Sequence, residues 1–187
     1  MTTRLWTGKG DDGTTGLLYG GRAPKSSRRI EAVGSVDEAQ AAIGLARAEA
    51  RRGSKLDQIL TRVERELWVL MAELATAPNR RSKLVDDETR VSAVMVSGLE
   101  ADTDSTGSRL DLKAEFVVPG QDRRSALLDV ARTVVRRAER AAQAVPVKDS
   151  LVLPYLNRLS SLLWVLARQA EGTSLPTRTR ARRPAAG

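Results

Sequence analysis

The chain has 187 residues, a formal net charge of +8, and neither cysteine nor histidine. It therefore has no disulfide, no Cys/His metal site, no thiol nucleophile and no imidazole base. The length supports one core, and we expect one domain over residues 1–176 and a disordered basic tail over residues 177–187. No apolar run approaches the roughly 20 residues of a membrane span, so we predict a cytoplasmic protein with no membrane partner.

The first 25 residues show no strand pattern and are predicted to be irregular. The first predicted helix covers about residues 28–51, and Gly53 lies just past its end. Its inward side chains are Ile30, Val33, Val36 and Ile43. The second begins near Leu56, with apolar residues at alternating four- and three-residue steps. These are Leu56, Leu60, Val63, Leu67, Leu70 and Leu74.

A third helix is predicted over about residues 87–102, after acidic residues suited to a helix N-terminus. Its apolar residues are Val91, Val94, Met95 and Leu99. The fourth covers residues 128–145 and stops before Pro146, and the fifth covers residues 152–170 and ends by Gly172. Residues 104–119 are predicted to be irregular. Long helices with short linkers indicate an all-α fold, a five-helix antiparallel bundle with an irregular glycine-rich N-terminal arm.

Within that arm, residues 7–17 read TGKGDDGTTGL. Glycines let backbone N–H groups approach an anion, threonine hydroxyls donate to phosphate oxygens, and lysine neutralises them. The segment is neither a P-loop nor a Rossmann turn, because GxxxxGK[ST] is absent from the sequence and no strand is predicted before it. It favours a polyphosphate ligand, and the alternative is a flexible arm with ordinary turn glycines.

Residues 131–142, ARTVVRRAERAA, place charged side chains beside an apolar stripe. At about 100° per residue, Arg132 and Glu139 fall on the border of the stripe, Arg136 lies further round, and Arg137 points away from the core. Arg136 and Glu139 are three residues apart, so the carboxylate can orient a phosphate-binding guanidinium. The alternative is a solvated helix face. On the last helix, Asn157 and its neighbour Arg158 could meet a nucleotide, or Asn157 could be a capping or surface residue.

In order and spacing these segments resemble the PduO-type ATP:cob(I)alamin adenosyltransferases. The blocks that carry the resemblance are TGKGDDGTTGL, GGRAPKSSRRIEAVGSVDEAQAAIGLA, AEFVVPG, ARTVVRRAER and YLNRLSSLLWVLAR. The resemblance implies a homotrimeric five-helix bundle with ATP between adjacent subunits. It also implies transfer of the 5′-deoxyadenosyl group of ATP to cob(I)alamin with release of tripolyphosphate. The implied cofactors are ATP and Mg2+, and the resemblance identifies no metal ligand.

Further implications of the resemblance concern individual residues. Asp37 and Arg132 match an intersubunit salt bridge, Phe116 matches the aromatic residue that displaces the lower axial ligand of the corrinoid, and Arg136 completes the catalytic set. Gly8 stands where the family usually has a basic residue, with Lys9 next to it, and Val33 stands where a tyrosine is common. The implied nucleotide contacts are Thr7, Gly8, Lys9, Gly10, Thr15, Gly16, Lys25, Arg136, Arg137, Ala138, Glu139, Arg140 and Asn157.

This reaction fits the composition, because Co(I) is itself the nucleophile and no protein base is needed. The implied partners are an electron-donating reductase and an acceptor enzyme that depends on adenosylcobalamin. One alternative is a non-catalytic helical trimer that binds ATP or a corrinoid as a sensor or carrier. Another is a nucleic-acid-binding bundle that uses its arginine tail. With 3% aromatic residues, we expect that bundle to bind nucleic acid without sequence specificity.

Overall fold

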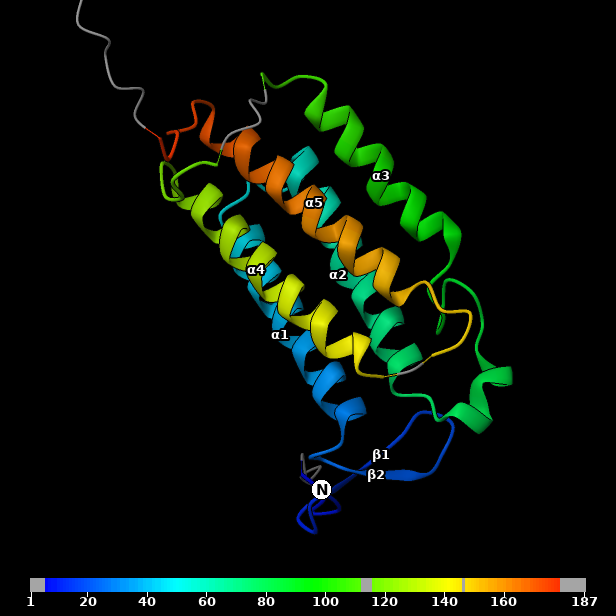
Figure 1. The fold of residues 1–187 in the computed structure, drawn as a ribbon. Coiled ribbons are helices and arrows are strands. Elements are labelled where there is room, and N and C mark those ends of the chain that lie inside the picture. Colours follow the sequence, from blue (N-terminus) through cyan, green and yellow to red (C-terminus); the bar gives the residue numbers. More distant parts are fainter. Residues whose placement is uncertain (1–5, 112–115, 146, 179–187) are drawn as a thin grey trace, which may run out of the picture.

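The computed structural model describes residues 6–111, 116–145 and 147–178. Five helices form the bundle (Figure 1): α1 Arg28–Ala48, α2 Lys55–Leu74, α3 Ala93–Gly107, α4 Arg123–Gln143 and α5 Val152–Glu171. A 3-10 helix, η1 Pro78–Lys83, joins α2 to the segment before α3. α4 packs against α1 and α5, while α2 packs against α1 and α3 against α5. The predicted five-helix bundle is confirmed.

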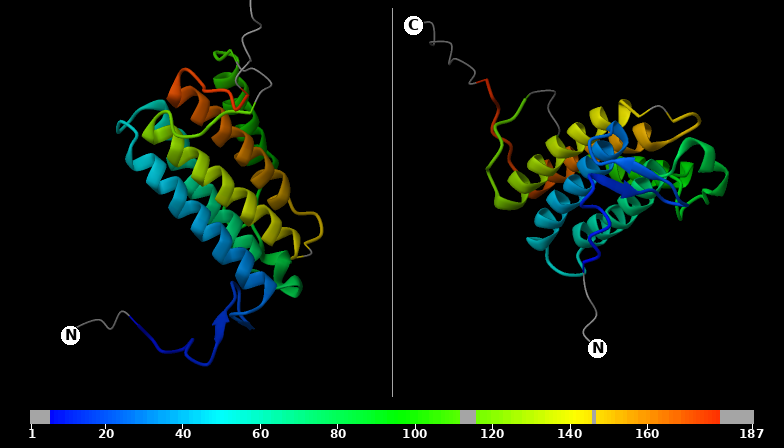
Figure 2. Two further views of the ribbon diagram at one scale, coloured as in Figure 1. Left: turned by 60° about the vertical axis from the view of Figure 1, so that its left-hand side comes forward. Right: turned by 90° about the horizontal axis from the view of Figure 1, so that it is seen from below.

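The glycine-rich arm contains a short antiparallel hairpin, which the sequence did not predict. Strand β1, Thr14–Gly16, pairs with β2, Arg22–Pro24. Both strands have three residues, too few to show the alternation that identifies a strand. The hairpin lies at the end of the bundle where α1 begins (Figures 1 and 2). It is attached to the end of α2, because the Leu18 amide donates to the Ala75 carbonyl at 3.0 Å.

The N-terminal ends of α1 to α4 are set by capping side chains. Ser27, Ser54, Ser92 and Asp122 cap α1 to α4, each side chain accepting a backbone N–H of the first turn. The predicted start of the third helix at residue 87 is wrong. Asp87 has φ +65°, which is incompatible with a helix, and α3 instead begins after Ser92 and continues to Gly107.

The core contains most of the apolar residues of α2 and α5, and the prediction for α1 is corrected. Of the apolar residues in and just before α3, Val91, Met95 and Leu99 are buried, whereas Val94 is 72% exposed. On α1, Ile30 and Val33 are only partly buried. The buried apolar residues of α1 are mainly small: Ala32, Val36, Ala39, Ala42, Ile43 and Ala46. Small side chains let α1 approach α4 closely.

The far end of α5 is joined to the segment before α4. The Val118 amide donates to the Leu175 carbonyl at 2.8 Å, and the Thr177 amide donates to the Phe116 carbonyl at 2.9 Å. Most of the predicted basic tail, residues 179–187, lies outside the described residues, as do residues 1–5, 112–115 and 146. Among the helices of the described ranges, none combines the length and the hydropathy needed to cross a bilayer.

Candidate functional site

The glycine-rich loop, residues 7–13, consists of two successive turns before β1. The Asp11 amide donates to the Gly8 carbonyl at 3.1 Å, and the Gly13 amide donates to the Gly10 carbonyl at 3.2 Å. Gly8 and Gly13 have φ of +67° and +76°, values that favour glycine. The loop is largely exposed, and so is its lysine, Lys9. The Lys9 side chain is therefore accessible to an anion, whereas the Asp11 and Gly13 amides are used in the turns themselves.

On the hairpin, the predicted contacts Thr15 and Gly16 lie in β1, and Lys25 directly follows β2. Thr15 is half-buried, whereas Gly16 and Lys25 are exposed. A Cβ added at Gly10 would come within 3.1 Å of the Lys25 ammonium nitrogen and 3.3 Å of the Thr14 carbonyl oxygen. Gly10 thus allows the Lys25 side chain to lie against the loop.

Arg22, which the sequence analysis missed, connects the two halves of this arm. Its Nη2 donates to the Lys9 carbonyl at 2.6 Å, and its Nε donates to the Thr14 hydroxyl at 2.8 Å. Its guanidinium also pairs with Asp12 at 3.2 Å. Hydrogen bonds from the Thr14 amide and hydroxyl, followed by the charge of Arg22, lower the pKa of Asp12 below its usual value. The signal in the sequence was the hairpin spacing, which pairs Gly16 with Arg22.

A second group of predicted residues gathers on the outer face of α4 and α5. Arg136 borders two adjoining open depressions of about 340 and 250 Å³. The first is also lined by Arg132, Ser160, Ser161, Trp164 and Val165, and the second by Glu139, Arg140, Gln143 and Leu153. The structure therefore places Arg136 between two concave surfaces, with Arg140 one helical turn away.

Asn157 of α5 joins this face through hydrogen bonds. Its Nδ2 donates to Glu139 Oε1 at 3.1 Å, and its Oδ1 accepts from Arg158 Nη1 at 2.9 Å. Glu139 was expected to orient Arg136, but between these two residues the described coordinates contain no ion pair or hydrogen bond. Glu139 instead orients Asn157. Glu139 on α4 and the neighbouring Arg158 on α5 therefore fix the Asn157 amide, while the Arg136 guanidinium stays available.

Two other residues of the predicted α4 set have different surroundings. Ala138 is fully buried, so its side chain packs in the core and cannot contact a ligand on this face. This corrects its assignment as a nucleotide contact. Arg137 is exposed and pairs with Glu38 of α1. Its guanidinium is thus directed toward α1, away from the α4–α5 depressions.

Asp37 and Arg132 are not paired within the chain. Arg132 Nε donates to Asp129 Oδ1 at 3.0 Å, and Asp129 is also bound by the buried Arg168 at 2.6 Å. The Asp37 side chain is exposed on α1, and among the described residues it has no ion pair with Arg132. An acidic and a basic side chain are thus presented on separate surfaces of the chain.

Phe116 is 88% exposed. Its backbone is held by Thr177, as described above, but its ring has little protein around it. The segment that begins at residue 116 lies at the end of the bundle opposite the hairpin (Figure 1). Within one chain, the structure brings together the α4–α5 residues and leaves the glycine-rich loop and the Phe116 segment at opposite ends.

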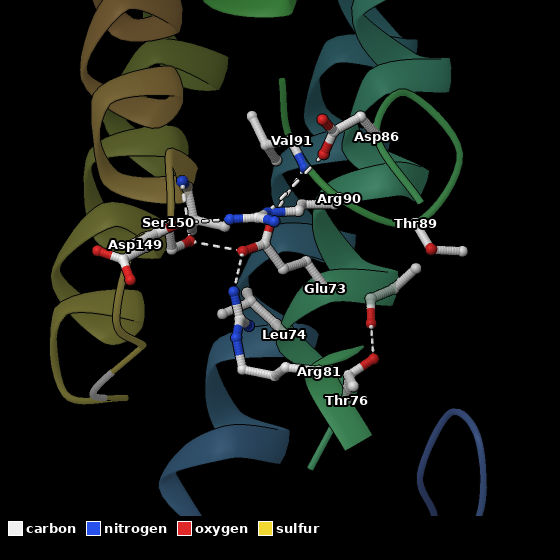
Figure 3. A network of polar contacts seen from close by, with 12 residues as sticks. Glu73, Leu74, Thr76, Arg81, Asp86, Thr89, Arg90, Val91, Asp149 and Ser150 are labelled. Carbon is white, nitrogen blue, oxygen red and sulfur yellow. Dashed lines mark hydrogen bonds and ion pairs between the residues drawn. The ribbon is translucent and has the colours of Figure 1, made fainter. Parts of the chain in front are cut away.

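Glu73 is a second residue that the sequence analysis missed. Its fully buried carboxylate accepts from Arg81 Nη2 at 2.8 Å, Ser150 Oγ at 2.7 Å and the Val91 amide at 2.8 Å (Figure 3). These donors belong to η1, the segment before α3 and the loop between α4 and α5. Glu73 therefore connects the end of α2, where the hairpin is attached, to the start of α5. The signal was a carboxylate between the apolar positions Leu70 and Leu74.

The comparisons agree on one family. The family model described as cobalamin adenosyltransferase matches residues 5–170. The corrinoid adenosyltransferase of Mycobacterium tuberculosis is 40% identical over 173 residues, covering 90% of this chain and 89% of the relative. That of Bacillus subtilis is 34% identical over 177 residues, covering 91% and 88%.

A solved structure shares the fold. It is a phenylalanine-to-histidine variant of a PduO-type ATP:corrinoid adenosyltransferase from Lactobacillus reuteri, complexed with cobalamin and ATP. Its TM-score is 0.83 at 24% identity, and the match covers 94% of this chain and 97% of that one. The family match over most of the chain and the curated relatives together establish that this chain belongs to the cobalamin adenosyltransferase family.

Proposed function

We propose that this protein transfers the 5′-deoxyadenosyl group of ATP to the Co(I) centre of a corrinoid, forming adenosylcobalamin and releasing tripolyphosphate. The observation that carries the proposal is the α4–α5 face, where Arg136 lies between two depressions and an interhelical network fixes Asn157. The face offers a free guanidinium and an oriented amide, which suit a phosphate and a polar group of a nucleotide.

ATP is proposed to bind between subunits of a homotrimer. The glycine-rich loop projects from one end of the bundle (Figure 2), and in the described part of the chain no hydrogen bond or ion pair joins residues 7–16 to α4 or α5. A neighbouring subunit would bring the two together, as in a head-to-tail ring. The assigned contacts are Thr7, Gly8, Lys9, Gly10, Thr15, Gly16 and Lys25 from one subunit, and Arg136, Glu139, Arg140 and Asn157 from the next, whereas Arg137 is left out because it pairs with Glu38 of α1.

The chemistry requires alignment and charge stabilisation. The Co(I) electron pair forms a bond to C5′ of ATP, and the C5′–O bond breaks with its electrons passing to the departing tripolyphosphate. Lys9, Lys25 and Arg136 would stabilise the negative charge on that group. We include Mg2+ as part of the ATP complex. Mg2+ in nucleotide sites is held mainly by phosphate oxygens and water, and the exposed Asp11 carboxylate of the loop offers a further oxygen ligand.

The corrinoid is proposed to bind against Phe116. An exposed phenyl ring is suited to displacing a polar lower ligand from cobalt, which leaves four-coordinate Co(II) with a lower-lying empty orbital. That species accepts an electron more readily from the proposed reductase. Asp37 of one subunit and Arg132 of another would close the pocket as an ion pair. Delivery of the product to an enzyme that depends on adenosylcobalamin, and a cytoplasmic location, remain predictions from the sequence.

The first test is to mix purified protein with ATP, Mg2+ and chemically reduced cobalamin, and to follow the loss of Co(I) absorbance. We expect protein-dependent formation of adenosylcobalamin with one tripolyphosphate released for each product. ATP binding without any conversion would reject the transferase and favour the sensor or carrier alternative. Heat-inactivated protein provides the control.

A mixing experiment tests the shared site. Arg136→Ala removes a contact of the helical face, and Lys25→Ala removes one of the arm, so each variant alone should have little activity. Refolded together in equal amounts, random trimers should recover about one quarter of wild-type turnover, because each site needs an intact arm and an intact neighbouring face. No recovery in mixed trimers would place both halves of the site in the same subunit.

A further inference from the structure

Arg22 is the residue through which the hairpin holds the glycine-rich loop. Its guanidinium reaches the Lys9 carbonyl at 2.6 Å on the far side of the loop and the Thr14 hydroxyl at 2.8 Å at the start of β1. In the described part of the chain, no other hydrogen bond joins residues 7–11 to β2. The first turn of the loop otherwise has only local hydrogen bonds among its described residues, from the Asp11 amide to the Gly8 carbonyl and from the Lys9 amide to the Thr7 hydroxyl.

Asp12 completes this arrangement and compensates the charge of Arg22. One Asp12 carboxylate oxygen accepts from the Thr14 amide at 2.9 Å and the Thr14 hydroxyl at 2.8 Å, and the same oxygen pairs with Arg22 at 3.2 Å. The lowered pKa of Asp12 is consistent with an ionised partner. Arg22 and Asp12 together add no net charge to the loop. Lys9 and Lys25 remain as its exposed positive charges.

We propose that Arg22 is a positioning residue, which with Asp12 sets the glycine-rich loop in its triphosphate-binding conformation before ATP arrives. The inference rests on the proposed function, because it takes the loop to be part of the ATP site. A flexible glycine loop would otherwise lose conformational freedom on binding, at a cost in affinity. By linking the Lys9 carbonyl to β2, Arg22 fixes the backbone that presents the loop amides and the Lys9 side chain.

The test compares Arg22→Ala and Arg22→Lys with Arg51→Ala, which removes an exposed arginine just after α1, at the opposite end of that helix from the hairpin. Amide hydrogen exchange of residues 8–14 is measured without ligand, and ATP and tripolyphosphate affinities are measured by calorimetry. We expect faster loop exchange and roughly tenfold weaker binding of both ligands in Arg22→Ala. In Arg22→Ala, KM for ATP should rise much more than kcat falls. Arg22→Lys should lie between, because lysine cannot span both acceptors.

Asp12→Asn separates positioning from direct phosphate contact. If Arg22 positions the loop, weakening its partner should accelerate loop exchange and weaken ATP binding. If Arg22 binds phosphate directly, removing the competing carboxylate should strengthen ATP binding, and that result would overturn the inference. Unchanged loop exchange in Arg22→Ala would also overturn it. If wild-type protein forms no adenosylcobalamin while Arg22→Ala still loosens the loop and weakens ATP binding, the transferase proposal fails and the role of Arg22 stands.

Discussion

Residues 7–16 are largely exposed and depend on hydrogen bonds for their conformation, whereas Arg136 and Asn157 project from two helices whose opposite faces are fully buried. The core holds α4 and α5 in place, because burying each leucine side chain contributes about 1.5–3 kcal/mol. The side chains on the outer face of the two helices are therefore fixed in position as well. The loop has no such support and relies on Arg22 and on the attachment of Leu18 to α2. One half of the proposed site is therefore rigid, and the other half adjusts more easily.

The largest effect should come from the rigid half. Arg136→Ala removes a free guanidinium from a preorganised surface, and we expect turnover to fall by about 100- to 1,000-fold. The measurement is adenosylcobalamin formation at saturating ATP. Arg65→Ala on the exposed side of α2 loses the same charge and should keep its activity. Near-normal rate and ATP affinity in Arg136→Ala would remove Arg136 from the site.

Substituting Phe116 tests whether its exposed ring acts on the corrinoid without contributing to ATP binding. Phe116→Ala should leave ATP affinity unchanged and abolish the four-coordinate Co(II) spectrum, lowering turnover from Co(II) by roughly tenfold or more. Starting from chemically reduced Co(I), the loss should be smaller, because the reduction step is bypassed. Val118→Ala in the same segment is the control. An unchanged Co(II) spectrum with ATP bound would contradict the role of the ring.

A substitution in the glycine-rich loop should have a smaller effect on turnover than Arg136→Ala or Phe116→Ala. A methyl group at Gly10 would meet the end of the flexible Lys25 side chain and the Thr14 carbonyl, so Gly10→Ala should shift the loop by a few tenths of an ångström. We expect KM for ATP to rise roughly three- to tenfold with kcat little changed. The matched variant is Gly53→Ala, at a positive-φ turn between α1 and α2, which should affect stability but not KM. A large fall in kcat for Gly10→Ala would mean that the loop is as rigid as the helices.

This contrast also explains what could be predicted from the sequence. The α2 and α5 helices were predictable, because leucines at three- and four-residue steps leave one arrangement that buries them. The exposed Arg137 and the bordering Arg132 followed from the same periodicity. The start of α3 did not, because the acidic residues before it form a turn with Asp87 at positive φ and the helix is capped by Ser92.

The residues that were missed act through contacts between distant segments. Arg22 reaches 13 residues back to Lys9, and Glu73 reaches 77 residues forward to Ser150. Periodicity describes one helix at a time and contains no information about such contacts. The same limit applies to Asp37 and Arg132, whose proposed pairing depends on a neighbouring subunit. Sequence reasoning predicted which side of α4 carries Arg132 and Arg137, and it left the connections of the glycine-rich loop unidentified.

Glu73→Gln should have the smallest effect on turnover and tests whether the two halves are independent within one subunit. Glutamine cannot accept from Arg81, Ser150 and the Val91 amide together, since its amide nitrogen would face a donor. We expect a loss of about 1–3 kcal/mol of folding free energy, measured by urea denaturation, with turnover at 25 °C within about twofold of wild type. Glu88→Gln, an exposed change of the same chemistry, should change neither. If turnover fell strongly while the protein stayed folded, the Glu73 network would be holding the hairpin and the α4–α5 loop in register. The site would then depend on the internal alignment of each subunit as well as on its neighbour.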